Sequence, residues 1–346
     1  MKKLFLLLLL LPVFLSLEIL ACSRVLWSGN NGLVITGRTM DWPYPFDTHM
    51  FIFPRNTLYK GGSGFATWRG KYGTVSLAGA TTPGKGIDAV FDGVNEHGLV
   101  ANLLYLGETE FPKPGRKKIS FAAWVQYVLS NFKNVDEAIV FFSENKISIV
   151  PFKFGPGGVA KASVHLSLSD SSGDSAVIEY IDGKATIHHG KNYTVMTNSP
   201  EYDKQLTLNS YWEKQDGNLY LPGSHQSEDR FVRASFYLKN LPKEMSENSS
   251  VASIFSIIRN VSVPWGVKDD KHPNLSPTYW RSVVNHKSGV YFFESATSPS
   301  VIWLNYKNID FTIEGIRALS VENRVDLHGD ISKYFTKSKG IAFLEN

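Results

Sequence analysis

The chain of 346 residues has little cysteine: Cys22 is the only one, which excludes a disulfide within the chain. It also lacks a strong charge of one sign. The 36 Lys and Arg face 32 Asp and Glu, so the formal net charge is +4, and the basic residues form no dense stripe. We therefore expect no nucleic acid among its partners.

Metal-ligand spacings are also missing, because there is no second cysteine and no H-E-x-x-H motif. Repeats, low-complexity tracts and long linkers are missing as well. The apolar run over residues 4–17 has 14 residues, too few to cross a bilayer comfortably. With 43% hydrophobic residues, the chain can build a sizeable core, which excludes general disorder.

That apolar run has the features of a secretory signal peptide. Lys2 and Lys3 precede it, and Ala21 is a small residue suited to signal-peptidase cleavage. We predict that residues 1–21 are removed on export and that residues 22–346 form a single domain, periplasmic or secreted. Cleavage after Ala21 makes Cys22 the first residue of the mature protein.

Three hypotheses explain a cysteine at this position. It could be an ordinary small apolar residue beside a leader. It could be a lipobox cysteine that is acylated and anchors the chain, although Leu20 stands where a small residue is usual. It could also be an N-terminal nucleophile, whose own α-amine, with a pKa of about 8, serves as the base for the thiol.

Hydrophobic patterning beyond Cys22 predicts short strands with helices between two groups of them. A hairpin series is predicted over 164–189, with a turn at Asp182-Gly183 and a further strand over 193–197. Other strands are expected over 32–37, 49–53, 72–78, 98–106, 278–285, 289–294 and 301–304. Helices are expected over 120–132, 134–143, 200–212, 230–238 and 251–259.

Five segments, taken in order, resemble the choloylglycine hydrolase and penicillin V acylase family. The processed cysteine is followed by G-R-x-M-D, which Gly37-Arg38-Thr39-Met40-Asp41 matches. Further matches are G-x-N-E-x-G-L at 93–99, S-D-x-x-G-x-x-x-x-I-E at 169–179, T-N-S-P at 197–200, and L-P-G followed by R-F-x-R at 221–233. The resemblance covers essentially all of the chain after residue 21.

The resemblance implies an α+β fold, the N-terminal-nucleophile hydrolase sandwich of four layers (αββα), and hydrolysis of a linear amide without a metal or organic cofactor. It makes Cys22 the nucleophile, Arg38 and Arg230 its charge partners, and Asp41 the group that holds the α-amine. The oxyanion donors would be the side-chain amide of Asn198 and a group at Asn102, its backbone N–H. Trp42, Phe91 and Tyr105 are candidates for an apolar pocket that binds the acyl group of a small-molecule amide.

Only 31 residues separate Asn198 from Arg230, so the longer insert of gut bile-salt hydrolases is missing. This short form resembles exported penicillin V acylases, some of which also cleave long-chain N-acyl homoserine lactones. It argues against tetramers and leaves a homo-oligomer open. Two alternatives stay open: hydrolysis of conjugated bile salts, and a non-catalytic surface lipoprotein anchored through Cys22. Cleavage with a free amine would leave no membrane anchor.

Overall fold

The computed structural model describes residues 22–44, 47–61, 64–155, 158, 160–215, 220–267 and 276–344. The predicted signal peptide, residues 1–21, lies outside the described residues. Within the described part, most strands belong to two large sheets, one of seven strands and one of nine.

The seven-stranded sheet begins with Cys22 and is antiparallel except where its last two strands pair. In spatial order it contains β16 (Val195–Met196), β1 (Cys22–Ser28), β2 (Val34–Asp41), β17 (Thr278–Asn285), β18 (Val290–Ser295), β19 (Val301–Asn305) and β21 (Gly329–Asp330).

The nine-stranded sheet is antiparallel throughout. In spatial order it contains β15 (Lys184–His189), β14 (Ser175–Ile181), β13 (Val164–Ser169), β8 (Val100–Tyr105), β7 (Ala89–Asn95), β6 (Thr74–Gly79), β3 (Thr48–Phe53), β20 (Arg317–Ser320) and β22 (Thr336–Lys337). Three short ribbons pair β4 (Leu58–Lys60) with β5 (Thr67–Arg69), β9 (Lys118–Ser120) with β10 (Ser148–Val150), and β11 (Lys153–Phe154) with β12 (Ala160–Lys161).

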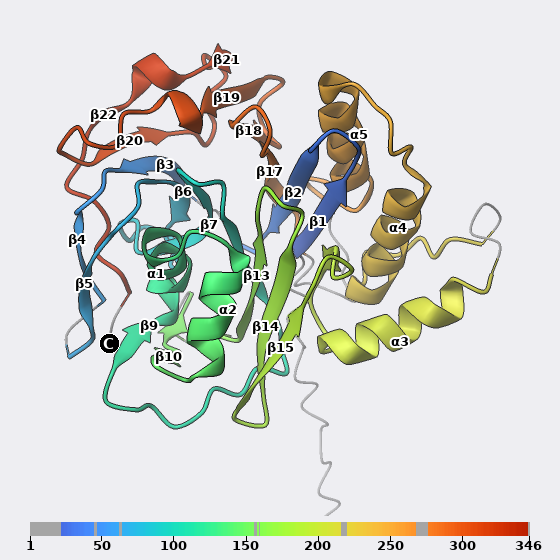
Figure 1. Ribbon diagram of the computed structural model, residues 1–346, viewed down its shortest axis with the longest axis horizontal. Coiled ribbons are helices and arrows are strands. Elements are labelled where there is room, and N and C mark those ends of the chain that lie inside the picture. Colours follow the sequence, from blue (N-terminus) through green and yellow to red (C-terminus); the bar gives the residue numbers. More distant parts are fainter. Residues whose placement is uncertain are drawn as a thin grey trace, which may run out of the picture.

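The helices cover the outer faces of the two sheets. On the nine-stranded sheet, α1 (Trp124–Asn131) packs against β6, β7 and β8, and α2 (Val135–Ser143) against β14 and β15. On the seven-stranded sheet, α4 (Ser227–Asn240) and α5 (Glu247–Asn260) contact β1, and α3 (Tyr202–Trp212) packs on α4. Figure 1 shows the sheets between these helix pairs. This is the four-layer αββα arrangement that the sequence predicts.

Because each sheet is covered on both faces, its central strands are buried along their whole length. Every residue of β2 and of β7 is buried, including Arg38, Asp41 and Asp92. Buried polar groups need hydrogen-bond partners, and buried charges need counter-charges. The buried charged side chains of β2 and β7 therefore need oppositely charged or hydrogen-bonding partners nearby.

Local signals read from the sequence explain some of the element boundaries. Asn134 caps α2, because its side-chain oxygen accepts a hydrogen bond from the Glu137 N–H (3.0 Å). Asp182 and Gly183 both have positive φ, the backbone that a tight β14–β15 hairpin requires.

The strand predicted over 193–197 is shorter and lies elsewhere in the fold. It covers Val195–Met196 and pairs with β1 of the seven-stranded sheet, not with the preceding hairpin. The turn after β15 carries the chain across to the other sheet, which hydrophobic periodicity does not reveal.

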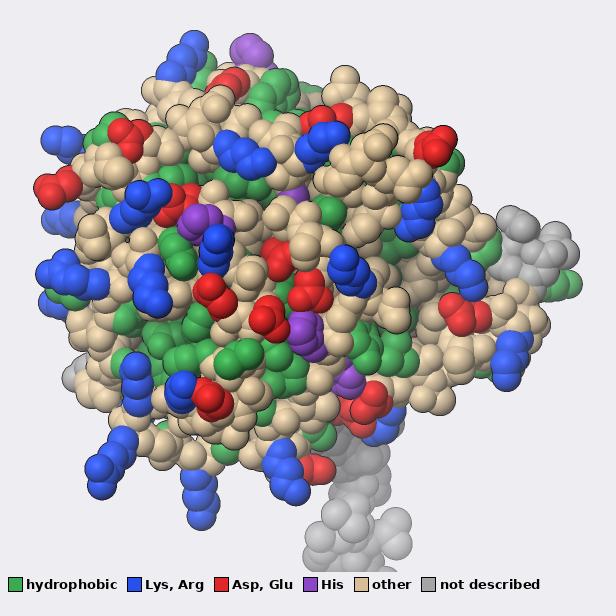
Figure 2. Space-filling view, in the orientation of Figure 1, with side chains coloured by type: hydrophobic (Ala, Val, Ile, Leu, Met, Phe, Trp, Pro, Cys, Tyr) green, Lys and Arg blue, Asp and Glu red, His purple; other side chains and the backbone are tan. Residues whose placement is uncertain are grey.

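The face shown in Figure 2 carries both Lys or Arg and Asp or Glu side chains, with several acidic side chains near its middle. This mixture agrees with the small net charge of the sequence. None of the helices in the described part of the chain combines the length and the apolar character needed to cross a membrane.

Candidate active site around Cys22

Cys22 begins β1 and lies directly opposite Met40 of β2. Residues two apart in a strand share a face, so Arg38 lies on the same face as Met40. The Nη2 atom of Arg38 lies 4.0 Å from the Cys22 sulfur and 3.1 Å from the Met40 sulfur. The G-R-x-M-D spacing therefore places a fixed positive charge beside the thiol, because β1 and β2 pair in this register.

The Arg38 guanidinium occupies the place where the pairing of β7 and β8 ends. It donates hydrogen bonds to the carbonyls of Leu103 (2.8 Å) and Phe91. Its Nη1 lies 3.6 Å from a carboxylate oxygen of Asp92, and both side chains are almost fully buried. Asp92 therefore provides the counter-charge that a buried arginine requires.

Asp41 ends β2 with its carboxyl fully buried. One oxygen accepts a hydrogen bond from the Thr278 hydroxyl (2.6 Å), whereas Oδ2 has no hydrogen-bond partner among the described residues. Burial raises the pKa of Asp41 to about 6, although the positive charge of Arg230 acts in the opposite direction. The site thus holds a carboxyl group with an acceptor position still open.

Asn198 follows β16 and contacts Cys22 from the side opposite to Arg38. Its Oδ1 accepts hydrogen bonds from the Cys22 backbone nitrogen (2.7 Å) and from Arg230 Nη2 (2.7 Å). Its Nδ2 donates to the carbonyl of Tyr105 (2.8 Å). A carboxamide nitrogen carries two hydrogens. The Tyr105 bond uses one of them, so the other can donate to a ligand oxygen.

Arg230 lies in the first turn of α4 and is fully buried. Its Nη1 donates to the Cys22 carbonyl (2.6 Å) and to the Ser23 hydroxyl (2.7 Å), and its Nε donates to the His225 carbonyl (3.0 Å). The hydrogen bonds of both Nη atoms are thus directed at Cys22 and the residues beside it, although 208 positions separate Arg230 from Cys22.

The electrostatics of the thiol result from two opposing effects. Burial raises the pKa of Cys22, and this outweighs the lowering by the neighbouring Arg38. A thiol whose pKa is raised keeps its proton near neutral pH, so a nucleophilic role for Cys22 would require a base that takes this proton. Arg38 favours the thiolate once the proton has left.

The structure places Asn102 away from Asn198. The side-chain nitrogen Nδ2 of Asn102 donates to the Asp92 carboxylate (2.9 Å). The Leu106 N–H donates to the carbonyl of Ser163, the residue directly before β13, and N–H groups two or four residues apart in an extended chain point the same way. The Asn102 N–H therefore also points to β13, opposite to the carbonyl of Tyr105. The residue of β8 that meets Asn198 is Tyr105, so the oxyanion role expected for the Asn102 backbone does not fit this geometry.

The three predicted pocket aromatics all lie beside the cluster. Trp42 directly follows β2, the Phe91 carbonyl binds Arg38, and the Tyr105 carbonyl binds Asn198. Trp42 also stacks on Phe154, with ring centroids 5.4 Å apart, and its ring lies 6.4 Å from that of Phe91. Sequence reasoning missed Phe154. The buried rings of Trp42, Phe91 and Phe154 thus form an apolar wall, with Trp42 in contact with the other two.

Sequence reasoning also missed Asp92, Ser282 and Tyr291, which surround the far side of Arg38. A signal was present for Asp92, because it is the one charged residue in the apolar strand β7. No signal marked Ser282 or Tyr291, which come from β17 and β18. In the part of the chain that the structure describes, no three His, Cys, Asp or Glu side chains are grouped so as to hold a metal ion.

Comparisons with known proteins agree with this geometry. The family model of the linear amide C–N hydrolases, choloylglycine hydrolase family, matches residues 22–318. A penicillin V acylase of Pectobacterium atrosepticum is 48% identical over 323 residues, covering 88% of this chain and 85% of the relative. A bile salt hydrolase/transferase of Clostridium perfringens is 24% identical over 316 residues, covering 84% and 94%.

Solved structures show the same fold. A penicillin V acylase from Agrobacterium tumefaciens has a TM-score of 0.84 and 41% sequence identity, covering 93% of this chain and 99% of that one. A variant of the conjugated bile acid hydrolase from Clostridium perfringens has a TM-score of 0.73 at 22% identity, covering 87% and 97%. The chain therefore belongs to the choloylglycine hydrolase family of linear amide C–N hydrolases, and it is an amidohydrolase with the N-terminal-nucleophile hydrolase fold.

Proposed function

We propose that the chain, once residues 1–21 are removed, cleaves a linear amide with a hydrophobic acyl group, of the penicillin V or long-chain N-acyl homoserine lactone type. One observation carries the mechanism. The backbone nitrogen of Cys22 is held by Asn198 Oδ1 at 2.7 Å, while the sulfur faces Arg38. Nucleophile and base are thus atoms of one residue, each positioned by a different partner.

In the first step the α-amine takes the proton of the thiol, and the sulfur attacks the carbonyl carbon of the amide. The carbonyl electrons move to the oxygen, which the second Asn198 N–H stabilises; such a donor contributes about 3–4 kcal/mol. The intermediate collapses, the C–N bond breaks, and the ammonium group of Cys22 gives its proton to the leaving nitrogen. A thioester on Cys22 remains.

In the second step water attacks the thioester carbonyl and gives a proton to the α-amine. The same oxyanion forms again, and collapse breaks the C–S bond. The proton returns to the sulfur, and the free acid leaves. The open Oδ2 of Asp41 supports this assignment, because a terminal ammonium beside it would satisfy the buried acceptor.

The acyl preference rests on the wall of Trp42, Phe91 and Phe154 and on the similarity to penicillin V acylases. A flat aromatic or long apolar acyl group fits such a surface. We place the enzyme in the periplasm or outside the cell, because the predicted leader must be removed to free the amine.

A substrate panel tests the proposal with protein that begins at Cys22. Penicillin V and long-chain N-acyl homoserine lactones should be cleaved faster than glycine- and taurine-conjugated bile salts. Equal rates on the three classes would contradict the preference, and faster bile-salt cleavage would reverse it.

The nucleophile is tested by Cys22→Ser, which should lower hydrolysis about a thousandfold or more while the thermal unfolding temperature stays unchanged. Wild-type turnover by this variant would overturn the mechanism. Mass spectrometry of the mature N-terminus separates the enzyme from the lipoprotein alternative. A free Cys22 amine supports the enzyme, and an acylated amine rules out the base assigned here.

A further inference from the structure

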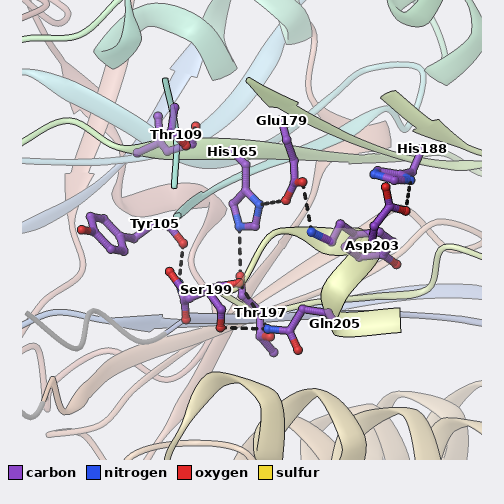
Figure 3. Close-up of polar contacts among 12 residues, drawn as sticks. Tyr105, Thr109, His165, Glu179, His188, Thr197, Ser199, Asp203 and Gln205 are labelled. Atoms are coloured by element: carbon purple, nitrogen blue, oxygen red, sulfur yellow. Dashed lines mark hydrogen bonds and ion pairs between the residues drawn. The ribbon is translucent and has the colours of Figure 1, made fainter. Parts of the chain in front are cut away.

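Two buried titratable side chains that the mechanism above does not use lie next to the Asn198 segment. His165 of β13 and Glu179 of β14 are each 1% exposed, with Nδ1 and Oε1 2.9 Å apart. Figure 3 shows the imidazole between the Glu179 carboxyl and the backbone of Thr197. His165 Nε2 lies 3.0 Å from the Thr197 carbonyl oxygen. The pair therefore contacts the residue immediately before Asn198.

The chemistry of the partners fixes the direction of these hydrogen bonds. The Thr197 carbonyl can only accept, so His165 Nε2 must carry a hydrogen and donate it. On its other side, His165 faces Glu179, whose second oxygen accepts a hydrogen bond from the Tyr202 N–H at the start of α3 (3.0 Å). Glu179 therefore holds the imidazole in one orientation, with its donor aimed at Thr197.

The segment that accepts this hydrogen bond, residues 197–199, lies beyond the end of its β-strand. The strand β16 ends at Met196, directly before the segment, so hydrogen bonds to side chains take the place of the backbone hydrogen bonds between strands. Ser227 accepts from the Asn198 N–H (2.8 Å), and Gln205 Nε2 donates to the Asn198 and Ser199 carbonyls (3.3 and 2.9 Å). These two supports come from α4 and α3, on the helix side.

His165 supplies the opposite support, from the nine-stranded sheet. It lies across from Leu104, the residue before Tyr105 on β8. Two neighbouring strands of that sheet thus contact the segment: His165 donates to the Thr197 carbonyl, and the Tyr105 carbonyl accepts from Asn198 Nδ2. The Asn198 amide is held between both sheets, and a change at either contact would shift its N–H relative to the Cys22 sulfur.

We propose that His165, oriented by Glu179, is a positioning residue for the oxyanion donor Asn198. The inference rests on the proposed function, because only an amide-cleaving site has an oxyanion to stabilise. His165 touches neither Cys22 nor substrate in this account. It acts by fixing the peptide on which the Asn198 carboxamide is carried, and small misplacements of a catalytic group can cost up to about a hundredfold in rate.

Three substitutions at one position separate the two hydrogen bonds of His165. The Gln side chain places an N–H near the place of Nε2, and the Asn side chain places one near Nδ1. His165→Gln should keep the bond to Thr197, whereas His165→Asn should keep only the bond to Glu179. His165→Phe keeps neither. We expect kcat to fall about 10- to 100-fold in the Asn and Phe variants and to recover most of the way in the Gln variant.

Two further measurements distinguish positioning from loss of structure. Alkylation of Cys22 by iodoacetamide needs the thiolate but no oxyanion donor. Because Asn198 Oδ1 also holds the Cys22 nitrogen, this rate should fall in the Asn and Phe variants, but several times less than kcat. Binding of phenoxyacetaldehyde, which forms a hemithioacetal oxyanion on the sulfur, should weaken in proportion to kcat. KM should change far less than kcat, because the lost interaction belongs to the transition state.

His188 provides a matched control on the neighbouring strand β15. It faces Asp203, with a 3.8 Å separation, and Figure 3 shows it beside that residue, apart from Thr197. His188→Asn should change kcat by less than about twofold. Wild-type kcat in His165→Asn and His165→Phe would overturn the inference, as would alkylation rates that fall as far as kcat. Wild-type hydrolysis in the same assay tests the proposed function separately; an inactive wild type overturns both.

Discussion

Asp92 and Asp41 are both buried in the cluster around Cys22 and Arg38, but their hydrogen bonding differs. Asp92 accepts from Asn102 (2.9 Å), Ser282 (2.9 Å) and Tyr291, and a guanidinium lies 3.6 Å away. Asp41 accepts from the Thr278 hydroxyl (2.6 Å), and its Oδ2 is without a partner among the described residues. One carboxyl is thus fully satisfied in the chain as folded, and the other still has an acceptor position to fill.

The difference indicates what each carboxyl is for. A saturated carboxylate that neutralises Arg38 contributes to stability and orients the arginine. An unsaturated one costs free energy unless another donor arrives, and the α-amine exposed by cleavage before Cys22 is such a donor. We therefore assign Asp92 a supporting role and Asp41 a catalytic one, and the predictions below test that division.

The largest effect is expected for Asp41→Asn in the protein that begins at Cys22. The amide cannot hold the ammonium as a carboxylate does, so kcat/KM should fall about a hundredfold or more. The free energy of unfolding should change little at neutral pH. Hydrolysis with penicillin V, beside a denaturation curve, measures both. Full activity in this variant would remove the distinction between the two carboxyls.

Asp92→Asn should act mainly on stability. It leaves the Arg38 charge buried without a counter-charge, which typically costs about 3–5 kcal/mol of the free energy of unfolding. The double variant Arg38→Met with Asp92→Asn should regain part of that stability but none of the hydrolysis. Urea denaturation measures the first expectation. A stable single variant would show that the Asp92 charge is not what neutralises Arg38.

The third prediction concerns pH and uses a form that begins at Ala21, so that the Cys22 nitrogen stays in a peptide bond. Burial raises the pKa of Asp41 from 3.8 to about 6. The stability that this provides is complete below pH 3.8 and is lost as the pH rises through 6. Asp41→Asn does not titrate, so its stability relative to wild type should rise with pH, by up to about 3 kcal/mol.

Denaturant unfolding at several values between pH 4 and pH 7 measures this difference. In the form that begins at Cys22, the terminal ammonium favours the charged carboxylate, so the same comparison should show a smaller rise. An equal rise in both forms would mean that the amine does not contact Asp41.

The smallest effect is expected for Ser282→Ala, which removes one of the hydrogen bonds to Asp92. We expect a loss of about 1 kcal/mol in the free energy of unfolding, with kcat/KM within about twofold of wild type. Thermal unfolding and the standard hydrolysis assay measure both. A large loss of activity without a loss of stability would move Asp92 into the catalytic group.

Much of the site could be predicted because its signals are local. The G-R-x-M-D segment and Cys22 lie on adjacent strands of one hairpin, so their spacing nearly determines their contact. Asn198 and Arg230 are far away in the chain, and the resemblance to a known family identified them, with their positions now shown beside Cys22.

Other features could not be predicted, because they depend on pairing between distant strands. Backbone N–H groups alternate in direction along β8, so the Asn102 N–H points toward β13. The residue of β8 that contacts Asn198 is Tyr105, three positions later, whereas the family resemblance indicates Asn102 as the oxyanion donor. The sequence pattern does not predict the His165–Glu179 pair either. Two polar residues on neighbouring strands become a pair only when the hairpin register and the start of α3 are both known.

The amino-acid sequence by itself predicted Cys22 as the nucleophile and indicated the family, all five α-helices and about half of the strands, because these depend on short motifs and on local periodicity. It did not predict β1 or β7. The tertiary structure alone decided which buried charges are neutralised and which carboxyl keeps an open oxygen. It also decided that the amide of Asn198 is held between two sheets. The physical reason is that burial and hydrogen-bond satisfaction are properties of surroundings, and segments more than a hundred residues apart supply the surroundings of Cys22.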